Sequence, residues 1–193
     1  SADAGTPPAE RMTPLEVRAT VSLSAIYGLR LFGMFLILPV FALWAAALPG
    51  WDKAWVGFAM GVYGFTQAIL QVPVGWLSDR VGRKPVLYIG LAVMALGSFI
   101  CASSTSVAGV VLGRMLQGAG AISSVTIALT ADLTRESQRT KAMALIGITI
   151  GLSFALSFVV APFLATVIGV PGIFALTGSL ALAAMAVVRY MVP

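Results

Sequence analysis

The sequence has no histidine and a single cysteine, Cys101, which lies inside an apolar run. One cysteine cannot form an internal disulfide, and without histidine or a cysteine cluster a zinc or haem site has almost no ligands to use. We therefore expect no metal and no cofactor. The chain also offers no nucleophile–base pair and no acid embedded in an apolar run, so an enzyme is the least expected class.

Charged residues are scarce as well. They make up 10% of the 193 residues, whereas 59% are apolar. A soluble domain is nearer half apolar and a quarter charged, and a chain this short cannot bury so much apolar surface away from water. The composition therefore predicts a protein that lies in a lipid bilayer. The formal charge of +5 does not indicate a nucleic-acid partner, because no basic helix face is interleaved with aromatic residues.

The apolar residues form runs, each long enough for the ~20 residues that cross the hydrocarbon core. We place the runs at 19–48, 54–78, 84–103, 107–131, 141–168 and 171–191. They show no two-residue alternation, so they predict helices rather than the strands of a barrel. The predicted fold is an all-α membrane protein with six transmembrane helices in residues 15–193, after a disordered tail over 1–14.

The basic residues in the connections and at the ends of the runs are distributed unequally between the two sides of the membrane. Only Lys53 lies on one side, in the first connection. The other side holds Arg11, Arg18, Arg80, Arg83, Lys84, Arg135, Arg139, Lys141 and Arg189. The positive-inside rule therefore predicts that both termini of this multi-pass protein are cytoplasmic.

Two arginines, Arg30 and Arg114, lie inside the apolar runs. An arginine in hydrocarbon costs at least ~2.5–3.5 kcal/mol, so each needs a wet or paired setting in the protein interior. Polar residues at helical spacing accompany them and extend along neighbouring runs. The candidate cavity residues are Tyr27, Arg30, Arg114, Gln117 and Gln67, with Tyr63 and Gln71 on the same stripe as Gln67. A water-filled cavity is one interpretation, and interhelical hydrogen bonding that only stabilises the bundle is the other.

Asp79 and Asp132 lie at the C-terminal ends of their predicted helices, where the helix dipole disfavours a negative charge. Each should therefore have a cationic partner, and the same two connections supply Arg80, Arg83, Arg135 and Arg139. This predicts a cluster of charges that joins the second and fourth spans, with solvated loop charges as the alternative. No acid lies in the membrane interior, so a proton-coupled cycle needs a carboxylate outside these residues, or Asp132 acting from the cytoplasmic edge.

Glycines recur at four-residue spacing in two of the runs, as Gly57 and Gly61 and as Gly147 and Gly151. Small residues at this spacing let helix backbones approach closely in lipid. These pairs predict helix–helix contacts within the bundle.

Two stretches carry a resemblance to a known family. Gly75-Trp76-Leu77-Ser78-Asp79-Arg80-Val81-Gly82-Arg83-Lys84-Pro85 resembles the signature G-x-L-[AS]-D-R-x-G-R-[KR]-P of the major facilitator superfamily, at every fixed position. Residues 114–121, RMLQGAGA, resemble the fourth-helix motif R-x-x-Q-G-x-G-A of the same family. The resemblance covers about residues 15–193 and is closest to the YajR-like branch of drug exporters, which implies a location in the bacterial inner membrane.

The resemblance implies the N-terminal six-helix half of the family's fold, built as two inverted three-helix repeats. It implies that Arg114 takes part in proton or substrate coupling and that the first and fourth spans line the central cavity. It also implies a conformational lock that holds two halves of a transporter together, formed by Gly75, Asp79, Arg80, Gly82, Arg83, Lys84, Asp132 and Arg139.

The function expected from these features is secondary active transport. The chain would supply one half of an exporter that moves a small amphipathic compound by alternating access, coupled to protons. Its partner would be a missing C-terminal six-helix half or a second copy of itself. A non-transporting assembly or sensor module remains the alternative, and the family's antiporter signature is present only in part, as Ala161-Pro162.

Overall fold

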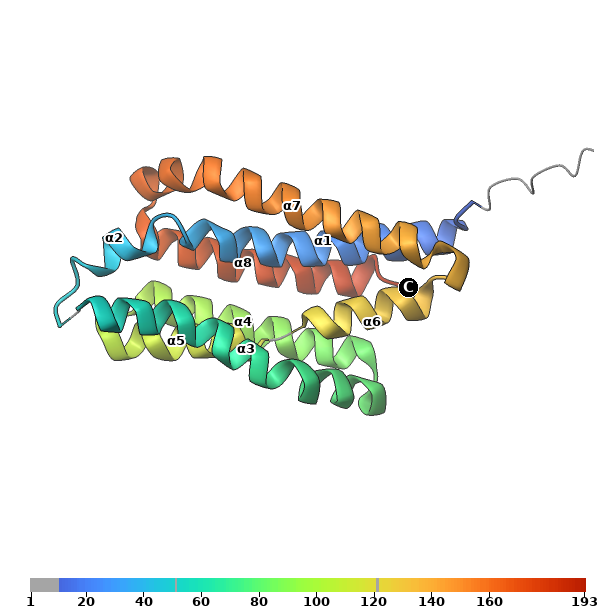
Figure 1. The fold of residues 1–193 in the computed structure, drawn as a ribbon, viewed down its shortest axis with the longest axis horizontal. Coiled ribbons are helices and arrows are strands. Elements are labelled where there is room, and N and C mark those ends of the chain that lie inside the picture. Colours follow the sequence, from blue (N-terminus) through green and yellow to red (C-terminus); the bar gives the residue numbers. More distant parts are fainter. Residues whose placement is uncertain (1–10, 51, 121) are drawn as a thin grey trace, which may run out of the picture.

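The computed structural model describes residues 11–50, 52–120 and 122–193, which form an elongated bundle of helices (Figure 1). The helices are α1 (Pro14–Ile37), α2 (Phe41–Ala45), α3 (Lys53–Val81), α4 (Arg83–Ser103), α5 (Val107–Ala119), α6 (Ser123–Leu133), α7 (Glu136–Val167) and α8 (Gly169–Tyr190). The described residues contain no strand, so the all-α class is confirmed. Residues 1–10 of the predicted tail lie outside the described part of the chain.

Side-chain caps set the starts of two of the long helices. The Thr13 hydroxyl accepts a hydrogen bond from the Glu16 amide, and the Glu16 carboxylate accepts one from the Thr13 amide. This capping box satisfies two backbone donors, and Pro14 follows at the first helical position, where it has no donor to lose. At the start of α3, Asp52 accepts from the Trp55 amide at 2.8 Å.

Two predicted spans are interrupted. The run 19–48 was expected to be one helix, but α1 ends at Ile37, because Pro39 has no N–H and its ring excludes the carbonyl four residues earlier. The short helix α2 follows. The run 107–131 is divided into α5 and α6, with Gly120 in a non-helical conformation (φ −75°, ψ 42°) between them.

The charged connection between the second and third spans is much shorter than predicted. Helix α3 continues to Val81 and α4 begins at Arg83, so Gly82 alone reverses the chain. Its φ of 104° lies in a region that side chains with a Cβ rarely adopt. The reversal is therefore specific to glycine, and it places Asp79 and Arg83 next to each other at the end of the bundle.

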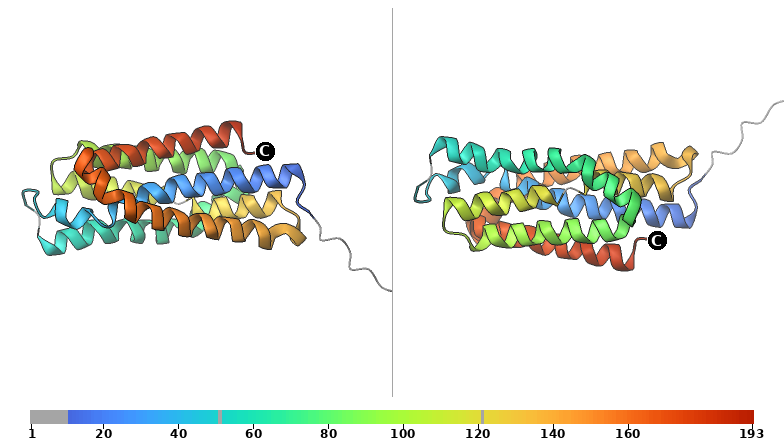
Figure 2. Two further views of the ribbon diagram at one scale, coloured as in Figure 1. Left: turned by 90° about the horizontal axis from the view of Figure 1, so that it is seen from above. Right: turned by 90° about the horizontal axis from the view of Figure 1, so that it is seen from below.

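The helix packing follows an internal repeat. Helix α1 packs against α7 and α8, helix α5 packs against α3 and α4, and α4 packs against α8 (Figures 1 and 2). Exchanging the first, second and third spans with the fourth, fifth and sixth reproduces the same set of pairs. Because each repeat has three spans, the second repeat crosses the membrane in the opposite sense. This confirms the predicted pair of inverted three-helix repeats.

Five helical segments are long and apolar enough to cross a membrane: Pro14–Ile37, Arg83–Ser103, Val107–Leu133, Glu136–Val167 and Gly169–Tyr190. Helix α3, with 29 residues, is long enough but less apolar, because it carries the stripe of Tyr63, Gln67 and Gln71. The polar side chains of this stripe therefore need partners inside the bundle.

The closest helix–helix contacts occur at glycines other than the predicted pairs. A Cβ on Gly97 of α4 would lie 2.6 Å from the Gly113 carbonyl of α5, and one on Gly118 would collide with the Tyr63 carbonyl of α3. No atom lies within 4 Å of the corresponding position at Gly57, Gly61, Gly147 or Gly151. The prediction that these four make contacts within the bundle was wrong, because the same spacing also occurs on faces that point away from it.

Candidate functional site: a buried arginine cavity and a charged end

Arg30 lies near the middle of the bundle. It follows the start of α1 by about 24 Å at 1.5 Å per residue, and its exposed fraction is 1%. One terminal nitrogen donates to the Ser123 hydroxyl at 3.3 Å, and the other donates to the Tyr63 hydroxyl at 3.2 Å and the Gln67 carbonyl oxygen at 3.5 Å. Its Nε has no hydrogen-bond partner among the described residues. The guanidinium therefore joins α1 to α3 and to the first residue of α6.

Arg114 joins α5 to α3 and is equally buried, with an exposed fraction of 2%. Its Nε donates to the Ala59 carbonyl at 3.2 Å, and one Nη donates to the Met60 carbonyl at 3.4 Å. The other Nη donates to the Gln117 carbonyl oxygen at 3.0 Å. The Gln117 amide in turn donates to the Ser98 hydroxyl of α4 at 2.9 Å, so this network links three helices.

Tyr63 connects the two arginines, although it was not among the residues predicted for the cavity. Its hydroxyl accepts from Arg30, and its ring centroid lies 4.9 Å from the guanidinium carbon of Arg114. That distance is within the range of a cation–π contact. The signal was present in the sequence, since Tyr63 precedes Gln67 by one helical turn. Tyr27 is also buried, one turn before Arg30, but it does not line the cavity described next.

A cavity of about 230 Å³ lies between α1, α3 and α5. Its apolar side comes from α1 and the residue that follows it, and its polar side comes from α3 and α5. The lining residues are Leu31, Met34, Phe35, Leu38, Tyr63, Gln67 and Arg114. Three of the lining groups, Tyr63, Gln67 and Arg114, belong to the network that holds the two buried arginines.

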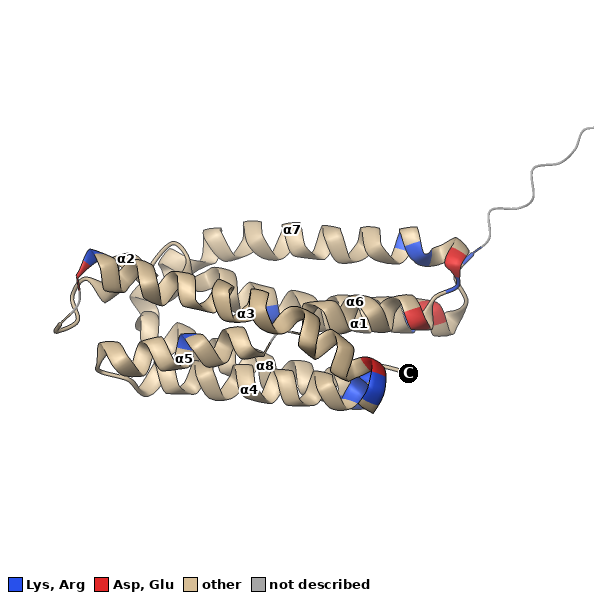
Figure 3. Ribbon diagram, turned by 60° about the horizontal axis from the view of Figure 1, so that its bottom comes forward, with Lys and Arg blue, Asp and Glu red and all other residues tan. Residues whose placement is uncertain are grey.

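The described acidic residues all lie at helix ends, away from this cavity. They are Glu16, Asp52, Asp79, Asp132 and Glu136. Figure 3 shows the acidic positions at the two ends of the bundle, with isolated basic positions between them. The two buried guanidinium groups therefore face no carboxylate within the described residues, although an unpaired charge in a low-dielectric interior is costly.

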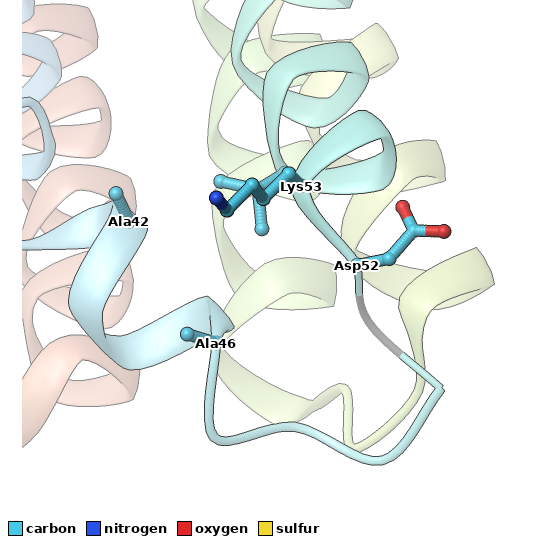
Figure 4. A pocket seen from close by; sticks show the side chains of 5 residues that line it. Ala42, Ala46, Asp52 and Lys53 are labelled. Atoms are coloured by element: carbon cyan, nitrogen blue, oxygen red, sulfur yellow. The ribbon is translucent and has the colours of Figure 1, made fainter.

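A second pocket lies at the end of the bundle that carries Asp52 and Lys53, between α2 and the start of α3 (Figure 4). Its volume is about 380 Å³, and its lining is Ala42, Ala46, Asp52, Lys53 and Val56. Both charged residues are exposed. The pocket offers no buried polar group, so the arginine cavity is the better candidate for a binding site.

The opposite end of the bundle, which we call the charged end, contains a bridge of three side chains. Arg83 contacts Asp79 at 2.6 Å and Asp132 at 3.0 Å, and it donates to the Ser78 hydroxyl at 2.5 Å. The bridge joins the end of α3, the start of α4 and the end of α6, as the expected cluster of charges required. The two aspartate side chains remain 58% and 53% exposed, so both are accessible to further partners.

The structure does not bring Arg80 or Arg139 into this bridge. The Arg80 guanidinium stacks over the Trp76 ring, with its carbon 4.3 Å from the ring centroid. Arg139 donates from Nε to the Ala131 carbonyl at 3.2 Å. Both side chains lie at the charged end, where they add positive charge around the bridge.

The remaining residues of the signature loop have separate local roles. Lys84 donates to the Val192 carbonyl at 2.9 Å and so holds the segment that follows α8. A Cβ on Gly75 would lie 3.2 Å from the Ser124 hydroxyl, so a glycine there lets α3 approach α6 closely. Each residue therefore shapes the charged end without touching the two aspartates.

The charged end also contains a contact that we call the α1 latch, the pairing of Glu16 with Arg135. The Glu16 carboxylate accepts from the Arg135 amide at 3.1 Å and from its Nε at 2.9 Å. Arg135 also donates to the Arg11 carbonyl at 2.9 Å. No feature of the sequence connected Glu16 to a residue in the α6–α7 connection.

Residues 23–193, which include the signature loop and the fourth-span motif, match the family model "Major Facilitator Superfamily". The chain belongs to this superfamily. It is 48% identical over 183 residues to the Inner membrane transport protein YajR of Escherichia coli (strain K12), covering 95% of this chain and 40% of that protein. It is 32% identical over 123 residues to the Multidrug resistance protein MdtL of Klebsiella pneumoniae, covering 62% of this chain and 29% of that protein.

The superfamily fold is also found among solved structures. The POT family transporter PepTSo superposes with a TM-score of 0.78 at 19% identity, covering 93% of this chain and 37% of that one. At that identity the likeness concerns the fold alone. The chain spans less than half the length of each of these relatives, and it corresponds to one half of the superfamily fold.

Proposed function

We propose that this chain forms one six-helix half of a secondary transporter that works by alternating access, with the charged end in the cytoplasm of a bacterium. The observation that carries this proposal is the Arg83 bridge between Asp79 and Asp132. Such a bridge at a bundle end can hold a moving partner in one state and release it in another. The nine-to-one distribution of basic residues outside the spans supports the orientation.

The second wall of the cavity is proposed to come from a further six-helix unit. Among the described residues, those that bound the arginine cavity come from α1, Leu38 after it, α3 and α5. Helices α3 and α7 carry glycines with no atom within 4 Å of the Cβ position, which suits a face against which another helix can pack. The unit is the remaining part of a longer protein in this proposal, and a second copy of the chain is the alternative.

The proposed cargo is a small amphipathic compound that is exported in exchange for protons. The names of the relatives YajR and MdtL, together with the signature loop, support transport and export. The described acids lie only at helix ends, so we assign the coupling carboxylate to the other half, or to Asp132 at the cytoplasmic edge.

Proteoliposomes that contain the full-length protein and a trapped pH-sensitive dye provide the test. A panel of amphipathic cations, anions and neutral compounds is added outside, and the internal pH is followed. At least one compound should cause a proton flux, and Arg83→Gln should reduce that flux strongly. Arg189→Gln is the matched control, because Arg189 is an exposed basic residue near the charged end that does not contact the two aspartates. No flux with any compound would leave a non-transporting membrane module as the better description.

A further inference from the structure

We infer that the arginine cavity receives the anionic head group of an amphipathic organic solute. The inference rests on the proposed transport function and specifies the chemical class of its substrate. It depends on which hydrogen-bonding groups the lining presents, on the balance of charge around it, and on the shape of its apolar side.

The Gln67 amide must direct its donors into the cavity. A guanidinium has only donors, so the group that faces Arg30 has to be an acceptor. The Gln67 carbonyl oxygen fills that role at 3.5 Å, which leaves its NH₂ group as the part of the amide available to a ligand.

The same argument fixes the polarity of Tyr63. Its oxygen accepts from Arg30 at 3.2 Å, so its own proton is available for donation. Tyr63 lines the cavity. Arg30 thus occupies one lone pair of the Tyr63 oxygen, and the hydroxyl proton can be donated to a ligand.

Arg114 supplies the third donor group. Its hydrogen bonds to the Ala59, Met60 and Gln117 oxygens use three of the five N–H groups of a guanidinium. The remaining N–H groups belong to a side chain that lines the cavity. Each of the three polar lining groups thus has a donor to offer, which suits a ligand that accepts hydrogen bonds.

The charge balance points the same way. Arg30 and Arg114 bring two positive charges to this region, and the described residues bring no carboxylate to it. A cationic ligand would have to approach both charges in a poorly solvated setting, whereas an anion would be attracted to them. The apolar side, formed by Leu31, Met34, Phe35 and Leu38, fits the hydrocarbon part of such a ligand.

The test uses three probes with the same ring system: 2-naphthoate, 2-naphthamide and 2-naphthylmethylammonium. Binding to the purified full-length protein in detergent is measured by calorimetry. Wild-type protein should bind 2-naphthoate at least about 10-fold more tightly than the ammonium compound. Gln67→Glu replaces the amide donors by a carboxylate at nearly constant volume, so this variant should lose that preference or reverse it.

Two further variants separate the site from general effects on folding. Tyr63→Phe keeps the ring beside Arg114 and removes the hydroxyl, so it should weaken 2-naphthoate binding several-fold without creating affinity for the ammonium compound. Gln71→Glu introduces the same chemical change one turn farther along α3, outside the lining, and should keep the wild-type preference.

Equal binding of the three probes, a preference for the ammonium compound, or no binding of 2-naphthoate to wild-type protein would overturn the inference. The last result would indicate that a carboxylate from the other half occupies the place. The proton-flux assay distinguishes this failure from failure of the transport proposal. If a cation causes proton flux and 2-naphthoate does not bind, only the proposed substrate class is rejected. If 2-naphthoate binds and no compound causes flux, the binding site is supported and the transport proposal is rejected.

Discussion

Replacing Gln117 by methionine should separate the buried network at Arg114 from simple packing. Gln117 is fully buried and makes two side-chain hydrogen bonds, one from Arg114 at 3.0 Å and one to Ser98 at 2.9 Å. Methionine has nearly the same volume and flexibility, so it fills the space without a large cavity. What it removes is the acceptor for a buried guanidinium and the donor to a buried hydroxyl.

The expected cost follows from those two bonds. Losing a hydrogen bond to a charged group costs about 1.5–3 kcal/mol. A neutral side-chain hydrogen bond between membrane helices contributes about 0.6 kcal/mol. The sum is about 2–3.5 kcal/mol, which corresponds to roughly a 30- to 300-fold change in the unfolding equilibrium constant.

The measurement is reversible unfolding of the full-length protein in mixed micelles, by titration with sodium dodecyl sulfate while helix content is followed by circular dichroism. A double-mutant cycle with Ser98→Ala isolates the smaller bond, with a coupling energy near 0.6 kcal/mol. The range for a hydrogen bond to a charged group begins well above ~0.5 kcal/mol. If Gln117→Met lowers the free energy of unfolding by less than about 0.5 kcal/mol, then Arg114 does not depend on this acceptor and the assigned network is wrong.

Two other contacts give predictions. Gly118→Ala places a methyl group against the Tyr63 carbonyl of α3. The free energy of unfolding in the same assay should therefore fall by about 1–3 kcal/mol. Glu16→Gln weakens the α1 latch, because a neutral amide is a poorer acceptor for Arg135 than a carboxylate. Hydrogen exchange at the Arg135 amide, measured by mass spectrometry, should then become faster.

Each of these changes has a matched control. Gly61→Ala adds the same methyl group to a neighbouring helix where no atom of this chain lies within 4 Å, so it should leave unfolding nearly unchanged when the 193-residue chain is measured without a second six-helix unit. Glu136→Gln alters an exposed acid in the first turn of α7 and should not affect exchange at Arg135. Equal effects from a variant and its control would contradict the contact assigned to that variant.

The fold class and the number of spans could be predicted from the sequence, because long apolar runs can be satisfied only by spanning helices. The inverted repeat was expected only from the resemblance of the two motifs to the superfamily. The sequence was insufficient for the interruptions. Pro39 was visible inside the first run, yet a proline in a membrane helix produces either a kink or an end, and the choice depends on the surrounding packing. The interruption near Gly120 likewise depends on how closely α5 approaches its neighbours.

The site was predicted in part for a similar reason. Arg30 and Arg114 are conspicuous because charges are rare in apolar runs. The link through Tyr63 depends on how α1, α3 and α5 pack, which periodicity does not reveal. The partner of Glu16 lies 119 residues away in the chain, and the glycine pairs had the right spacing on the wrong faces.

The fastening of α1 has a mechanical consequence. The helix is attached at the charged end by Glu16 and near its middle by Arg30, which reaches α3 and α6. A helix held at two points along its length tilts together with the helices that hold it and does not bend separately. A displacement of Arg135 in the α6–α7 connection would thus reach the arginine cavity as a tilt of α1 as one rigid helix.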